Sequence, residues 1–210
     1  MTSILKTDEI QSQNGGSVVK MQTLKHPSSS GNNLTLTASG GIKVPDGGNI
    51  GSASDPDAIS ISSSGYVVDS ARPYFQYKGA GANGETITDG SRAQFDVEIA
   101  QRGNNYNTTS WFFTTPIAGV YFFGAQLYTY NNTGSLQQWR IASENTSNAD
   151  EVTLTTNRIT SATIGDILVM SWMGYVPVNR RISIRNSSSG NRNLYMDNVA
   201  HSQWYGALIG

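Results

Sequence analysis

Apolar and polar side chains alternate along much of this chain with the two-residue period of β-strands. The clearest instance runs from Gly119 to Tyr130, where aromatic, Val, Leu and Thr residues follow a turn marked by Pro116 and Gly119. Around Phe122 both alternating sets are largely apolar, which predicts a strand that is covered on both sides. The domain's own core would cover one side, and a neighbouring subunit is the simplest cover for the other.

Two later runs share this two-sided apolar character. Ile167–Val176 follows a turn at Gly165-Asp166, and Gln203–Ile209 closes the chain. In contrast, Ala93–Ile99 alternates apolar residues with Gln, Asp and Glu, which predicts a strand with one face exposed to solvent. Weaker strands are expected at residues 136–142, 152–159 and 181–185. Many short strands between turn signals, with no helix of ordinary length, predict an all-β fold of the sandwich or jelly-roll type.

Residues 31–70 have a shorter repeating pattern, in which pairs of apolar residues recur between turns rich in Gly, Ser and Asp. Short strands joined by tight turns fit this pattern. A single chain has nothing to place on the apolar face of each strand, whereas several identical chains wound around one axis can bury these faces together. The segment therefore predicts an intertwined β stalk, with an unstructured linker as the alternative. Its apolar positions are Leu34, Leu36, Ile42, Val44, Ile50, Ile59, Ile61, Val67 and Val68.

Residues 1–30 carry apolar side chains without a helical stripe, and they end in a Pro- and Ser-rich linker at His26–Gly31. This composition is typical of a disordered tail or of an arm that another protein holds by strand addition or apolar docking. We expect an attachment arm whose docking segment is residues 1–24. The apolar positions that would make the contact are Ile4, Leu5, Ile10, Val18 and Val19. Aromatic density rises after Ala71-Arg72-Pro73, so the expected organisation is arm (1–30), stalk (31–70) and head (71–210).

The overall composition excludes several classes of function. Only 14% of residues are charged and the net charge is −1. The chain therefore lacks the excess of positive charge that would indicate binding to nucleic acid or to an anionic membrane. No apolar run is long enough for membrane insertion. The absence of cysteine excludes disulfides, thiolate chemistry and zinc–cysteine sites. The first residues lack the apolar core of a signal peptide, so we expect synthesis in a cytoplasm.

No residue pattern predicts catalysis, a metal site or a cofactor. The two histidines, His26 and His201, are far apart in the sequence, and Asp55-Pro-Asp57 lacks the Gly and Glu of a calcium-binding EF-hand loop. No Gly-x-Ser-x-Gly elbow occurs. No spaced pair of carboxylates indicates a glycosidase, but such pairs meet only in the folded protein, so an enzyme remains an alternative.

Three residues are candidates for ligand contact. Arg180 and Arg181 belong to a mildly basic cluster, which is most often a solvated face and less often an anion or glycan contact. The four tryptophans are more often core residues than platforms for sugars. Trp139 lies in one of the less apolar predicted strands and is the tryptophan that we expect to contact a ligand.

The spacing of aromatic and glycine residues in the head region resembles that of a known family. An aromatic residue is followed after six residues by Phe, after five more by Gly, and then by Tyr and Phe at alternate positions. These are Tyr106, Phe113, Gly119, Tyr121 and Phe123, with Phe122 inside the motif, and the closing strand adds Trp204, Gly206 and Leu208. The pattern resembles the globular heads of complement subcomponent q and the tumour necrosis factor domains, although Gln101 stands where that family prefers Asn or Asp. The resemblance implies a homotrimer with a jelly-roll head.

The start of the chain resembles a second group. Ile4–Gln11, followed by a Gly/Ser/Asp-rich repeat and Ile59-Ser-Ile61, looks like fibre proteins of tailed bacteriophages. This resemblance implies a virion protein: a trimeric tail fibre or receptor-binding protein that contacts other virion proteins through residues 1–24 and a host glycan or protein through its head. A capsid-decorating protein is the alternative, and a carbohydrate-processing enzyme is a third reading. A secreted complement-like recogniser is opposed by the missing signal peptide and collagen repeat.

Overall fold

The computed structural model describes residues 23–24, 34–36, 42–43, 49–51, 54, 59–69, 71–79, 81, 83–130, 135–147, 149, 151–160, 165–197 and 201–210. The chain divides into two compact units, Met1–Ser70 and Ala71–Gly210. The predicted attachment positions Ile4, Leu5, Ile10, Val18 and Val19 lie outside the described residues. The division of the first unit into arm and stalk stays a prediction.

The described residues of the first unit form two small antiparallel sheets of very short strands. One has the order β1-β2-β3, with bounds Thr23–Leu24, Leu34–Leu36 and Ile42–Lys43. The other has the order β4-β5-β6, with bounds Asn49–Ile50, Ile59–Ile61 and Val67–Asp69. Ile50, Ile59, Tyr66 and Val67 are all exposed. Short strands therefore form where the sequence pattern predicted them, and in the β4-β5-β6 sheet a single chain leaves Ile50, Ile59 and Val67 exposed to water.

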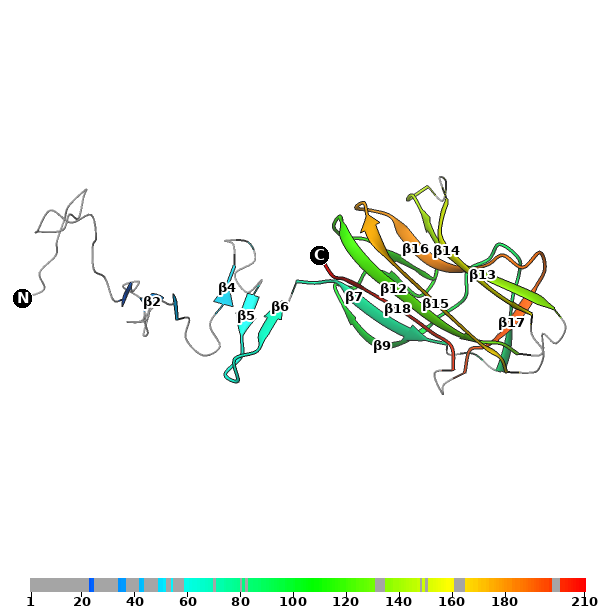
Figure 1. Cartoon of the computed structure of the whole chain (residues 1–210), viewed down its shortest axis with the longest axis horizontal. Coiled ribbons are helices and arrows are strands. Elements are labelled where there is room, and N and C mark those ends of the chain that lie inside the picture. Colours follow the sequence, from blue (N-terminus) through cyan, green and yellow to red (C-terminus); the bar gives the residue numbers. More distant parts are fainter. Residues whose placement is uncertain are drawn as a thin grey trace, which may run out of the picture. The chain divides into compact units, whose positions relative to one another are not determined.

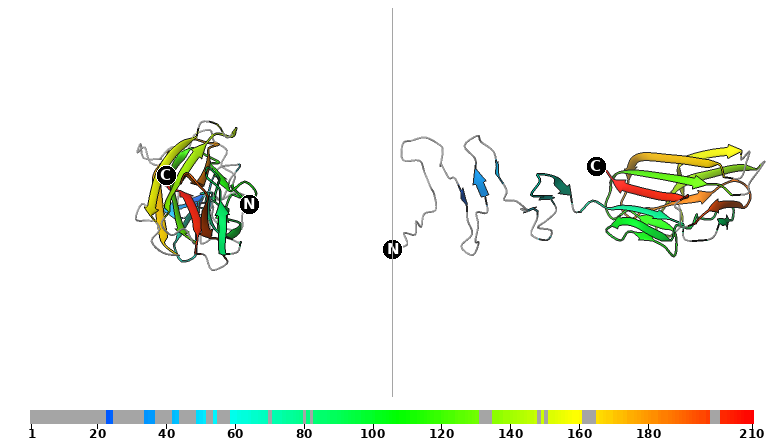
Figure 2. Two further views of the ribbon diagram at one scale, coloured as in Figure 1. Left: turned by 90° about the vertical axis from the view of Figure 1, so that its right-hand side faces the viewer. Right: turned by 90° about the horizontal axis from the view of Figure 1, so that it is seen from below.

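The second unit, which we call the head, is a sandwich of two antiparallel sheets around one core (Figure 1). The first sheet has the order β15-β12-β18-β7-β9, and its C-terminal strand β18, red in Figure 2, is paired on both sides. Its bounds are Ile167–Val176, Gly119–Tyr128, Gln203–Leu208, Tyr74–Lys78 and Val97–Arg102.

The second sheet has the order β10-β11-β16-β13-β14. Its bounds are Tyr106–Asn107, Phe112–Thr114, Arg181–Asn186, Leu136–Glu144 and Val152–Thr160. A separate pair joins β8 (Asn83–Ile87) to β17 (Arg192–Tyr195). No helix occurs among the described residues, so the all-β prediction is confirmed.

Aromatic side chains from both sheets fill the centre of the head. The Phe75 ring stacks on Phe113 with centroids 4.7 Å apart, and the Phe123 ring stacks on Trp204 at 5.6 Å. Tyr121 stacks on Phe123, and its hydroxyl donates a hydrogen bond of 2.8 Å to the Ile117 carbonyl. These rings have almost no exposed surface, and large aromatic groups at such positions contribute strongly to stability. The core therefore depends on aromatic residues that alternate along β7, β12 and β18.

Two details differ from what the pattern suggests. Gly119 is the first residue of β12, and its backbone φ lies outside the left-handed region. A Cβ at this position would lie 2.8 Å from the Gly210 carbonyl oxygen. The close approach of residue 210 therefore explains why the position is a glycine. The alternation predicted that Ile99 faces the core. Its side chain is exposed because the pairing register between β7 and β9 shifts at Gln76/Tyr77. A bulge of this kind turns the following side chains to the other face.

Candidate functional site

The first sheet of the head exposes an apolar surface on the side away from the core. We call it the outer apolar face. On its edge strand β15, Met173 is 64% exposed and Tyr175 is 67% exposed, and both point to the same side as Phe122 and Val120 of β12. Strands β18 and β7 continue this surface. The residues of the outer apolar face are Ile167, Val169, Met173, Tyr175, Val120, Phe122, Tyr205, Ala207 and Tyr74.

A shallow apolar hollow of about 390 Å³ lies within this face, over β12, β18 and β7. The rings of Phe122 and Tyr205 line it, with centroids 6.3 Å apart. The Tyr205 ring packs against Gly124, where a Cβ would come within 2.5 Å of it. Gln76 donates to Gln203 at 2.9 Å beside these rings. An apolar face of this extent on four adjacent strands is typical of a surface that another chain covers, and it is consistent with self-association.

The residues of the sequence motif fall on both sides of this sheet. Tyr106, Phe113, Tyr121, Phe123 and Trp204 lie in the core with at most 5% of their surface exposed. Gly206 lies below the rings of Phe123 and Phe75, which leave no room for a side chain there. Leu208 is partly buried against the same core. Phe122 alone points to the outer apolar face, so the motif combines core packing with one surface position.

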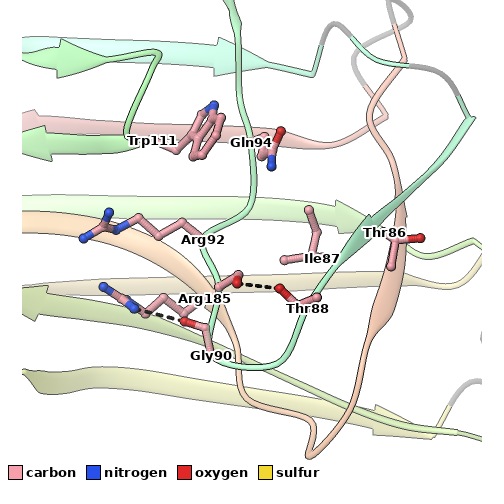
Figure 3. A pocket seen from close by; sticks show the side chains of 9 residues that line it. Thr86, Ile87, Thr88, Gly90, Arg92, Gln94, Trp111 and Arg185 are labelled. Carbon is pink, nitrogen blue, oxygen red and sulfur yellow. Dashed lines mark hydrogen bonds between the residues drawn. The ribbon is translucent and has the colours of Figure 1, made fainter.

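A second hollow, of about 340 Å³, opens beside β16 of the other sheet (Figure 3). Its wall is formed by the end of β8, the segment 88–94 that pairs with β16, and the indole of Trp111. Thr88 and Ser91 share a hydrogen bond of 2.6 Å across the turn that joins the two sides. Its lining is mostly polar and contains no carboxylate. The lining residues are Thr86, Ile87, Thr88, Gly90, Ser91, Arg92, Gln94, Trp111 and Arg185.

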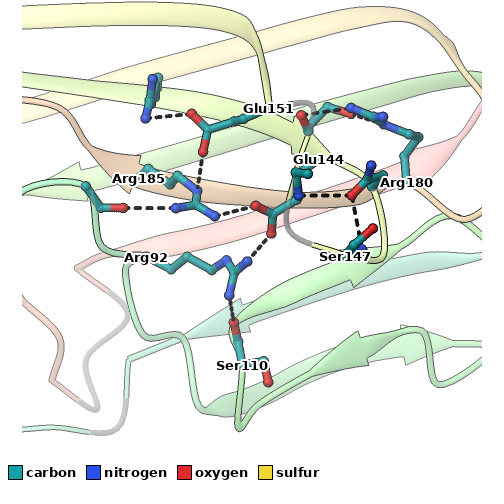
Figure 4. A network of polar contacts seen from close by, with 12 residues as sticks. Arg92, Ser110, Glu144, Ser147, Glu151, Arg180 and Arg185 are labelled. Carbon is teal, nitrogen blue, oxygen red and sulfur yellow. Dashed lines mark hydrogen bonds and ion pairs between the residues drawn. The ribbon is translucent and has the colours of Figure 1, made fainter.

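A buried ion network lies next to this hollow (Figure 4). The Glu144 side chain is 1% exposed and its two oxygens are bound separately, one by Arg92 and the other by Arg185 at 2.5 Å. Glu151 joins Arg185 at 3.1 Å to Arg140 at 2.7 Å. A buried charge is tolerated only with such partners. Three arginines against two glutamates leave a single net positive charge, so the network is close to balanced.

The predicted ligand contact at Trp139 is wrong. The indole is fully buried against the core, because Trp139 occupies an inward position of β13 beside Ile141. The strand looked weakly apolar because Gln138 and Arg140 occupy outward positions and the inward position 137 is a buried glutamine. A ligand has no access to this side chain in the folded head.

Arg180 and Arg181 have structural partners. The Arg180 guanidinium donates to the hydroxyl and carbonyl of Ser143 at 2.9 and 3.0 Å, and its backbone N–H donates to Thr115. The Arg181 guanidinium lies 4.5 Å above the Phe112 ring. Arg185, from the same basic stretch, lines the 340 Å³ hollow instead. Gln94 and Trp111 were not predicted as site residues, because nothing local in the sequence marks the turn that brings them to one hollow.

The described residues contain no group of His, Asp and Glu side chains able to hold a metal ion. His201 pairs with Asp197 at 2.9 Å and lies beside the rings of Tyr128 and Tyr195. In the described part of the chain, no helix is long and apolar enough to cross a membrane.

Tyr77 and Tyr106 are buried phenols with raised pKa values. Burial, followed by the negative charge of Glu98, raises the pKa of Tyr77 to about 12, and the Tyr77 hydroxyl donates to Glu98 at 3.2 Å. Burial also raises the pKa of Tyr106 well above its usual value. Both rings pack together with centroids 4.2 Å apart, so these hydroxyls act as structural groups that remain protonated.

Solved structures with the same architecture share little sequence with this chain. The globular domain of zebrafish complement 1qA is 14% identical with a TM-score of 0.53, and the alignment covers 66% of this chain and 98% of that one. Eiger TNF from S. frugiperda is 14% identical with a TM-score of 0.52, covering 66% and 93%. Murine APRIL is 10% identical with a TM-score of 0.51, covering 66% and 99%.

These likenesses show the fold: the head is a jelly roll of the complement 1q and tumour necrosis factor type. The fold predicted from the spaced aromatic motif is therefore confirmed. No protein-family model matches the sequence, and no curated protein matches it either.

Proposed function

We propose that this protein is a homotrimeric structural protein of a tailed-bacteriophage virion, a fibre or receptor-binding protein. Residues 1–24 attach it to other virion proteins, and the head, residues 71–210, is directed to a host-surface glycan or protein. The observation that carries the proposal is the outer apolar face, because an exposed apolar face of a sheet calls for a partner chain. The bacteriophage assignment rests on the resemblance of Ile4–Gln11 to fibre proteins.

A threefold arrangement is favoured by two separate regions. The motif from Tyr106 to Phe123 resembles a family of homotrimers, and it contributes Phe122 to the outer apolar face. In the first unit, Ile50, Ile59 and Val67 remain exposed on short strands, as expected of a stalk that needs further copies to bury them. Both regions would gain burial in the same assembly.

A role without catalysis fits the chemistry of the head. The most deeply buried carboxylate, Glu144, has each oxygen bound by an arginine, so it serves as an ion-pair partner and is not placed as a general acid. We propose that the protein needs no cofactor or metal ion and acts by binding alone.

The attachment role is tested by removing residues 1–24 from the protein in an otherwise complete phage. A matched control replaces the same residues with a Gly/Ser sequence of equal length. We expect both chains to form folded trimers that fail to enter particles, because the apolar docking positions are lost. Normal incorporation of either chain would contradict the proposed polarity.

Immunogold labelling of intact particles locates the protein. Labelling of the tail, with the head accessible to antibody, is the expected result. Labelling of the capsid would instead favour a decoration protein that stabilises the shell.

A further inference from the structure

We propose that the 340 Å³ hollow beside β16 is a saccharide-binding site, in which a pyranose ring stacks on the indole of Trp111. The inference rests on the proposed host-facing role of the head, and it gives that role a location and a ligand class. The volume lies near the lower end of the ~300–1,000 Å³ range of ligand pockets, which suits one or two sugar rings.

Trp111 adopts an unusual backbone conformation at this site. Its φ is +54°, in the left-handed region, which bulky side chains rarely occupy and which costs on the order of 1–3 kcal/mol. The turn before it holds this geometry: the Asn107 side chain accepts from the backbone N–H groups of Thr109 and Ser110 at 2.9 and 2.8 Å. The Trp111 N–H itself donates to the Asn107 carbonyl at 2.7 Å.

The indole is also fixed by its polar edge. Trp111 Nε1 donates to the Asp96 carboxylate at 2.7 Å, and the ring lies over the hollow next to Gln94 (Figure 3). With its N–H bound, the ring offers its π face, which attracts the partly positive C–H groups on one side of a pyranose. A rigid, partly exposed indole is therefore prepared for stacking before a ligand arrives.

Hydroxyl partners for a sugar surround this ring. Among the described residues, nothing hydrogen bonds to the amide of Gln94, which can both donate and accept. The Thr88 and Ser91 hydroxyls, 2.6 Å apart, lie across the hollow and keep unused acceptor lone pairs. The hollow thus combines one apolar platform with neutral polar groups. A site of this kind suits a neutral, hydroxyl-rich ring, because the platform stacks on the ring and the polar groups bind its hydroxyls.

Charge contributes little to this recognition. Arg92 and Arg185 line the hollow, but both bind Glu144, and Arg185 also donates to the Gly90 carbonyl at 3.0 Å. We therefore expect neutral sugars to bind at least as well as carboxylated ones. The site also lies on the second sheet and its flanking segment, away from the strands of the outer apolar face, so it stays open in the proposed trimer.

Saturation-transfer NMR on the full-length protein tests the site directly. The probes are the methyl glycosides of glucose, galactose, mannose, rhamnose and N-acetylglucosamine at millimolar concentration, with methyl glucuronide as the charged probe. We expect at least one neutral glycoside to receive saturation on the protons of one ring face. Failure of every neutral probe to bind the native protein would overturn the proposal, as would binding of the glucuronide alone.

Two variants and one control separate ligand contact from folding. Trp111→Gly removes the platform at a position where glycine has no strain, so the melting temperature should hold or rise while binding weakens about tenfold or more. Gln94→Ala removes a hydroxyl partner without removing a hydrogen bond between described residues, and it should weaken binding several-fold. Tyr66→Ala, which removes an exposed aromatic from the first unit, should leave binding unchanged. Unchanged binding in both Trp111→Gly and Gln94→Ala would overturn the site, whatever happens to stability.

Adsorption of the same proteins to host cells distinguishes this inference from the function on which it rests. If native protein and Trp111→Gly adsorb equally, the receptor role stands and the pocket assignment is wrong. If native protein does not adsorb, the receptor role fails, while the glycoside titration still decides the pocket.

Discussion

The two sheets of the head share one aromatic core, but their outer faces are opposite in character. The outer face of β15, β12 and β18 carries Met173, Tyr175 and Phe122 with little charge. The outer face of β16 and β13 carries Glu144 and Arg185 in a buried ion network. In water, exposed apolar area is unfavourable at roughly 25 cal/mol per Å², whereas a buried carboxylate is tolerated when arginines pair with it. The apolar face is therefore the one that is consistent with self-association, because a second chain could cover it.

The largest expected effect concerns the core that both faces share. Tyr121→Ala should destabilise the head by ~3–5 kcal/mol, because a fully buried aromatic ring and its hydrogen bond to Ile117 are lost. Chemical denaturation followed by circular dichroism measures this loss. A near-native midpoint would show that Tyr121 is not central to the core and that the two sheets do not depend on it.

A smaller effect is expected at the ion network. Glu144→Gln should destabilise the head by ~1–3 kcal/mol, because two arginines lose a buried, charged acceptor. Glu151→Gln is the matched control: that carboxylate is more exposed, so its loss should cost ~1 kcal/mol or less. The same denaturation series compares them. Equal effects would mean that the network is solvated and that the second face is an ordinary polar surface.

A further effect is confined to high pH. Since folding raises the pKa of Tyr77 from near 10 to about 12, the folded state holds this proton more tightly, and stability is lost as pH rises through that window. Tyr77→Phe removes this titration, so the gap in unfolding free energy between native protein and variant should be constant below about pH 10 and should shrink toward pH 12. Urea titrations across this range measure the gap. A gap that does not change with pH would contradict the buried position of the phenol.

The sequence predicted those features that depend on local alternation. The three two-sided runs around Phe122, Ile167–Val176 and Gln203–Ile209 became three neighbouring strands, β12, β15 and β18, of one sheet. Aromatic residues at alternate positions also marked the core, because the two-residue period assigns every second side chain to one face. The fold class followed from these strands and the turns between them.

Features that depend on long-range pairing could not be predicted in this way. Glu144 meets Arg92 across more than 50 residues of sequence, and segment 88–94 reaches β16 only through the folded topology. Trp139 was misassigned because its strand has polar outward positions, and strand composition does not show which tryptophan faces inward. The same limit hid the hollow that Trp111 and Gln94 both line.

The most direct test of the central claim is the mass of the full-length protein in solution, measured by light scattering at micromolar concentration. We predict three times the 22.6 kDa chain mass for the native protein and for Leu136→Asp, which adds a charge on the outer face of β13. Met173→Asp places the same charge on the outer apolar face, and it should give a lower mass with an unchanged circular dichroism spectrum. A monomeric native protein, or equal masses for Met173→Asp and Leu136→Asp, would contradict the account.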